Sequence, residues 1–74
     1  MPNAPFATSY NSLGIYYMQK SSWAQAERCY LKALAISPRY RDPYHNLVVL
    51  YRKLGDRDKA LAVEERLQAL GNRE

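Results

Sequence analysis

The chain has 74 residues, of which 47% are hydrophobic and 24% charged, and its net charge is +4. This length fits one small domain with a thin core, and the composition excludes a wholly disordered chain. The longest uninterrupted apolar run, Leu47 to Tyr51, has five residues, whereas a membrane span needs about 20. We therefore expect no membrane insertion.

Catalytic and metal-binding residue types are scarce. Cys29 is the only cysteine and His45 the only histidine, which excludes an internal disulfide and leaves too few ligands for a zinc site. Neither residue belongs to a pattern typical of a nucleophile and its base. No enzyme activity, metal or cofactor is expected. Residues 1–10 lack the basic and apolar regions of a signal peptide, so a cytoplasmic location is expected.

The chain repeats itself with a period of 34 residues. Identical residues that align at this offset are Tyr10 and Tyr44, Leu13 and Leu47, Tyr17 and Tyr51, Ala26 and Ala60, and Ala35 and Ala69. The two units then cover residues 7–40 and 41–74, and residues 1–6 form an N-terminal extension. This period is typical of arrays in which each unit is one helical hairpin.

The first unit divides into two amphipathic helices. Apolar residues recur at helical spacing in an expected buried stripe, followed by a break at residues 20–22. The stripe consists of Tyr10, Leu13, Gly14 and Tyr17. Ser22 and Gln25 then match a capping box. In this motif the serine hydroxyl accepts a hydrogen bond from a free backbone N–H of the second helix, and the glutamine side chain reaches back to the N-cap residue.

The second unit divides in the same way. Asp42 and Pro43 predict the start of the third helix, with aspartate as the N-cap and proline at the first helical position. Gly55 and Asp56 are expected to end that helix and cap the fourth. The sequence therefore predicts an all-α fold of two antiparallel hairpins.

These residues resemble the tetratricopeptide repeat, whose pattern runs Trp-x2-Leu-Gly-x2-Tyr, then Ala-x3-Phe, then Pro. Residues of the first unit that match are Leu13, Gly14, Tyr17, Ala26, Ala33 and Pro38, with Tyr10 and Tyr30 at the other aromatic positions. The resemblance implies that the hairpins stack as a short right-handed superhelix. The second unit departs from the pattern with Val48 at the glycine position. It also has Glu64, Leu67 and Asn72 at the aromatic, small and proline positions, from which we expect no ordinary repeat to follow it.

The resemblance also implies a function, because the first helices of successive hairpins in this family line a concave groove that holds a peptide. The corresponding groove residues here are Asn11, Ile15, Met18, His45, Val49, Arg52 and Lys53. Arg52 and Lys53 would make one end basic and able to pair with carboxylates. We therefore expect a module that binds a protein or peptide ligand, with an acidic ligand favoured.

Self-assembly is the alternative function, either as a homo-oligomer or within a larger protein of the same repeat type. About three repeats normally form a stable array, and this chain has two. We expect four apolar residues of the last helix to form a homodimer interface: Leu61, Val63, Leu67 and Leu70. Nucleic acid is not expected as a partner, because most tyrosines occupy helix-packing positions.

Overall fold

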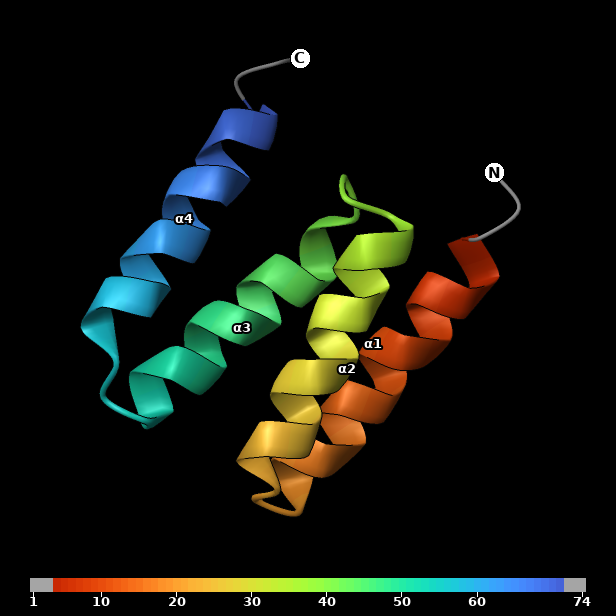
Figure 1. Ribbon diagram of the computed structural model, residues 1–74, viewed down its shortest axis with the longest axis horizontal. Coiled ribbons are helices and arrows are strands. Elements are labelled where there is room, and N and C mark those ends of the chain that lie inside the picture. Colours follow the sequence, from red (N-terminus) through yellow and green to blue (C-terminus); the bar gives the residue numbers. More distant parts are fainter. Residues whose placement is uncertain (1–3, 72–74) are drawn as a thin grey trace.

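The computed structural model describes residues 4–71, which form four α-helices (Figure 1). The helices are α1 (Ala4–Gln19), α2 (Trp23–Ile36), α3 (Arg41–Lys53) and α4 (Arg57–Gly71). Successive helices run in opposite directions, so α1 pairs with α2 and α3 pairs with α4, and α3 also packs against α2 and α1. The all-α fold of two antiparallel hairpins is confirmed.

The first helix starts earlier than expected. Helix α1 begins at Ala4, so the last three residues of the expected N-terminal extension are helical, and residues 1–3 and 72–74 lie outside the described part of the chain. None of the described helices has the length and apolar character needed to cross a membrane.

The core lies around α3, which packs against both α2 and α4. Its buried members are Ala26, Tyr30, Leu47, Leu50, Tyr51 and Ala60. Leu47 is 1% exposed, whereas Leu13 at the same repeat position is 41% exposed, because no described helix covers that side of α1. The expected burial of Leu13 is therefore wrong, and α1 instead buries Ala7, Asn11 and Gly14.

Two tyrosine hydroxyls of α3 fasten the hairpins together. Tyr44 Oη donates to the carbonyl oxygen of Pro38 at 2.7 Å, just beyond the end of α2. Tyr51 Oη donates to Glu27 Oε2 at 2.6 Å, near the start of α2. Burial, and then the bond to Glu27, raise the pKa of Tyr51 above its usual value, so its hydroxyl stays protonated and keeps donating.

The turn inside each hairpin has the same pair of backbone hydrogen bonds. The bonds are Ser21 N to Met18 O and Ser22 N to Tyr17 O in the first turn, and Gly55 N to Arg52 O and Asp56 N to Tyr51 O in the second. This pattern is the Schellman motif, which needs a residue with positive φ after the helix. Gly55 meets that need with φ 76°, whereas Ser21 adopts φ 60° against the preference of a residue with a side chain.

The helix caps follow the sequence only in part. Asp56 Oδ1 accepts a hydrogen bond from the backbone N–H of Lys59 at 3.2 Å, which confirms the cap of α4. Ser22 is the N-cap of α2 but its side chain makes no capping hydrogen bond, so the capping box is wrong. The Schellman turn sets Ser22 at ψ 75°, away from the extended geometry that usual caps adopt.

The start of α3 also differs from the expectation. The helix begins at Arg41 with Tyr40 as its N-cap, so Asp42 is not the cap and Pro43 is not the first helical residue. Both lie in the first turn, where the missing N–H of proline costs no hydrogen bond and the negative charge of Asp42 faces the positive end of the helix dipole.

Gly14 allows the close approach of α1 and α2. A Cβ atom at this position would lie 2.5 Å from Cε1 of Tyr30, and Tyr30 is 1% exposed, so the ring has no free space to move into. The corresponding residues of the second hairpin are Val48 and Glu64. The glycine is therefore matched to the tyrosine of its own hairpin.

We expect Gly14→Ala to lower the free energy of unfolding by about 1–3 kcal/mol, because overpacking forces a buried ring to shift. Chemical denaturation would measure the change. Gly71→Ala is the matched control in α4, since a Cβ there would lie 3.8 Å from the nearest atom, an Arg41 nitrogen. Equal stability of the wild type and the Gly14→Ala variant would contradict the close packing of Gly14 on Tyr30.

The two turns offer a paired test of positive φ. We expect Ser21→Gly to raise the free energy of unfolding by roughly 1 kcal/mol and Gly55→Ser to lower it by a similar amount, because a side chain is disfavoured in the left-handed region. Urea unfolding of the two variants would show opposite shifts of the midpoint. Shifts of the same sign would mean that the turns do not share one geometry.

Candidate protein-binding site

A hydrogen bond between asparagines joins the first helices of the two hairpins. Asn46 Nδ2 of α3 donates to Asn11 Oδ1 of α1 at 2.9 Å. Asn11 is 5% exposed, so its side chain is occupied in holding α1 beside α3. The sequence predicts Asn11 as an open ligand contact. In the structure its side chain instead supports the surface that α1 and α3 form.

Besides Arg52, four of the expected groove residues lie exposed on α1 and α3. Ile15 is 40% and Val49 48% exposed, and both occupy the same position of their repeats. His45 and Lys53 of α3 are exposed as well. Met18 is different, because it is half-buried and packs against the core. The structure thus leaves an apolar centre with polar and basic side chains on α3.

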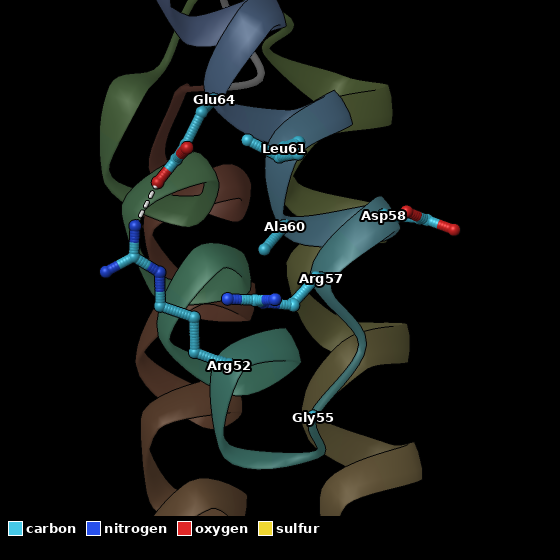
Figure 2. A pocket seen from close by; sticks show the side chains of 7 residues that line it. All are labelled: Arg52, Gly55, Arg57, Asp58, Ala60, Leu61 and Glu64. Atoms are coloured by element: carbon cyan, nitrogen blue, oxygen red, sulfur yellow. Dashed lines mark hydrogen bonds and ion pairs between the residues drawn. The ribbon is translucent and has the colours of Figure 1, made fainter.

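Arg52 also lines a hollow of about 690 Å³ formed by the end of α3, the following turn and α4. Figure 2 shows Arg52 paired with Glu64, Arg57 pointing into the hollow, and Asp58 pointing away from it. The Glu64 carboxylate therefore has a cation of its own chain as partner.

A second, more apolar groove lies between α2 and α4. Its volume is about 440 Å³, and the lining residues are Leu31, Leu34, Ala35, Pro38, Tyr44, Leu47, Ala62, Val63 and Arg66. Val63 packs against the core in this groove, and its side chain is half-buried. The groove lies over the α2–α3 junction, away from the surface that carries Ile15 and Val49.

The residues expected to mediate self-association do not form one exposed strip. Leu61 is 57% exposed, but Val63, Leu67 and Leu70 are half-buried, because the buried side of α4 runs through them. Homodimer formation stays a prediction, and within α4 only Leu61 among the four offers a largely open apolar side chain.

The remaining reactive side chains do not converge. Cys29 of α2 is buried, and burial raises the pKa of its thiol, which disfavours the nucleophilic thiolate. His45 lies on α3. Within residues 4–71 no three His, Cys, Asp or Glu side chains gather as metal ligands. The arrangement presents surfaces for binding.

Two stacked hairpins with a constant period define a helical repeat protein. A family model described as Tetratricopeptide repeat matches residues 5–72, and the chain belongs to this family. No curated protein and no solved structure matches the chain significantly. The resemblance drawn from the sequence is therefore confirmed, and with it a scaffold fold whose members typically mediate protein–protein interactions.

Two features of these surfaces were not predicted from the sequence. The first is the partner of Arg52, although Glu64, a charge at an aromatic position, was a signal that a cation lay close. The second is the pairing of Asn11 with Asn46, for which the only signal was a polar residue on the buried side of α1.

We expect Asn46→Ala to lower the free energy of unfolding by about 1–3 kcal/mol, because it leaves the buried Asn11 side chain without its donor. Thermal or urea unfolding would measure the loss. In Asn46→Ala combined with Asn11→Leu, which removes both polar groups, part of the stability should return. A single variant as stable as the wild type would show that water replaces the Asn46 donor at no cost.

Proposed function

We propose that the chain binds a protein or peptide segment on the surface of α1 and α3, with Ile15 and Val49 as its apolar centre. The observation that carries the proposal is the exposure of these two side chains, 40% and 48%, at one repeat position. Exposed apolar groups gathered on one face mark interaction sites. The Asn11–Asn46 bond fixes the two helices relative to each other, which lowers the entropic cost of binding.

An acidic ligand fits this surface best. Lys53 is exposed beside the apolar centre, and Arg52, with a side chain 66% exposed, is held only by Glu64. An exposed ion pair contributes at most about 1 kcal/mol, so a ligand carboxylate can replace Glu64 on Arg52 at small cost. The proposed setting is the cytoplasm.

Selection of peptides from a random library on the immobilised chain would test the proposal. We expect the selected peptides to combine apolar and acidic residues, and Val49→Asp to weaken their binding at least tenfold in fluorescence anisotropy. Leu31→Asp is the matched control, because Leu31 is 49% exposed but lies on α2. Binding that is unchanged in Val49→Asp, or weakened equally by Leu31→Asp, would remove the α1–α3 surface from consideration.

Charge reversal tests the acidic preference separately. We expect Lys53→Glu to weaken the same peptides severalfold, and the difference from the wild type to shrink as salt is added, because exposed charges are screened. Helicity should be unchanged, since Lys53 lies exposed at the end of α3. Selected peptides without acidic residues, or indifferent to Lys53→Glu, would leave the apolar centre as the whole site.

A further inference from the structure

The opposite side of α1 carries a second surface that the proposed function does not use. Tyr10, Leu13 and Tyr17 lie there, and we call them the outer triad. Leu13 precedes Ile15 by two residues, which corresponds to about 200° around a helix. The triad therefore points away from the α1–α3 surface. Leu13 is 41% exposed, and the 16 residues of α1 include no acidic or basic side chain.

The interior of the molecule shows what covers such a triad. Tyr44, Leu47 and Tyr51 repeat it on α3 at the same spacing, and there they are 8%, 1% and 6% exposed. They pack against α2 along its length, because Tyr51 contacts Glu27 near its start and Tyr44 contacts Pro38 just after its end. The same three residue types are therefore buried on α3, whereas on α1 Leu13 is exposed and Tyr10 and Tyr17 are half-buried, with Tyr17 in contact with the core.

Each member of the buried triad has a definite role. Leu47 fills the centre of the junction next to Ala26 and Tyr30. The two tyrosine hydroxyls, two helical turns apart, donate to a backbone carbonyl at one end of α2 and to the Glu27 carboxylate at the other. A helix suited to this face thus has small and aromatic residues along its middle and a carboxylate near its N-terminus.

We propose that the outer triad of α1 binds, in trans, a helix of another protein that has the features of α2. Leu13 contacts the middle of that helix, and the Tyr17 hydroxyl donates to a carboxylate near its start, as Tyr51 does to Glu27. The proposal goes beyond the peptide surface of α1 and α3 because it uses the other side of α1 and a ligand of stated pattern.

The charges around the triad fit an acidic helix. Lys32 Nζ lies 5.7 Å from the centre of the Tyr10 ring, and Lys20 Nζ lies 5.4 Å from the centre of the neighbouring Tyr16 ring. Helix α1, which has no charged side chain, is therefore bordered by the ammonium groups of Lys20 and Lys32. A carboxylate on the incoming helix meets positive potential on approach as well as the Tyr17 donor.

A second copy of the chain fits the triad poorly. The α4 face that corresponds to α2 has Leu61 where α2 has Glu27, so it provides no acceptor for Tyr17. It also has Glu64 in place of Tyr30 and the bulkier Leu67 in place of Ala33. Head-to-tail stacking of copies would bury a hydroxyl donor without a partner, which is costly.

A synthetic peptide with the sequence of residues 22–38 is the probe. Cys29→Ser prevents disulfide formation, and a lactam between Arg28→Glu and Lys32, both exposed in α2, keeps the isolated peptide helical. We expect this peptide to bind the intact chain in fluorescence anisotropy. Tyr17→Phe should weaken binding about tenfold, the loss typical of a hydrogen bond to a charged group, and Leu13→Asp should abolish it.

A peptide variant with Glu27→Gln isolates the proposed hydrogen bond. It should bind the wild-type chain about tenfold more weakly, yet bind the Tyr17→Phe variant almost as well as the parent peptide does, because the two changes remove one interaction. Independent losses, which would multiply to about a hundredfold, would overturn the pairing of Tyr17 with the carboxylate.

Control variants separate this site from the other surfaces. Val49→Asp should leave peptide binding unchanged, so failure of the α1–α3 proposal and failure of this one are distinguishable. Tyr51→Phe should also leave it unchanged, whereas a peptide that replaced the chain's own α2 would respond to Tyr51. A change of peptide binding in Tyr51→Phe would overturn the proposal. So would the absence of binding at about 1 mM peptide, or a Leu13→Asp variant that alters only self-association in sedimentation.

Discussion

Burial of Leu47 between α2 and α3 is the contact on which the rest of the structure depends. A single hairpin has too little apolar area to fold alone, and stacking a second one onto it makes a continuous core. Tyr44 and Tyr51 then set the register of that stack, because each hydroxyl reaches a different end of α2. With α2 and α3 fixed, α1 and α3 lie close enough for Asn46 to bond to Asn11.

Much of this arrangement could be predicted because it follows from repetition. The 34-residue period and the small residues Gly14 and Ala26 identify two hairpins and their close contacts, and the structure has both. Leu13 shows the limit of the method. The repeat gives Leu13 and Leu47 the same role, but a repeat pattern describes an interior unit, and whether a neighbour covers a face depends on the unit's place in the array.

Local motifs failed where backbone geometry overrode residue type. Ser22 has the side chain of a cap, yet the turn places Ser21 in the left-handed region and Ser22 at ψ 75°, and the Ser22 side chain makes no capping hydrogen bond. Asp56 follows the same kind of turn and does cap its helix. Its carboxylate oxygens lie one bond further from the backbone than a serine hydroxyl does, which extends their reach to the Lys59 N–H.

The two ends of the array differ in how closely they copy the interior junction. The α1 end keeps all three residues that α3 uses, so its chemistry remains that of a stacking surface. The α4 end has replaced the carboxylate of Glu27 by Leu61 and the ring of Tyr30 by Glu64, which turns back to Arg52 of its own hairpin. An interior junction needs both halves, and only the α1 face keeps the residue types of the α3 half, whereas α4 differs from the α2 half at three positions. The proposed helix-binding face is therefore confined to α1, while the proposed α1–α3 surface, held by the Asn11–Asn46 bond, is independent of it.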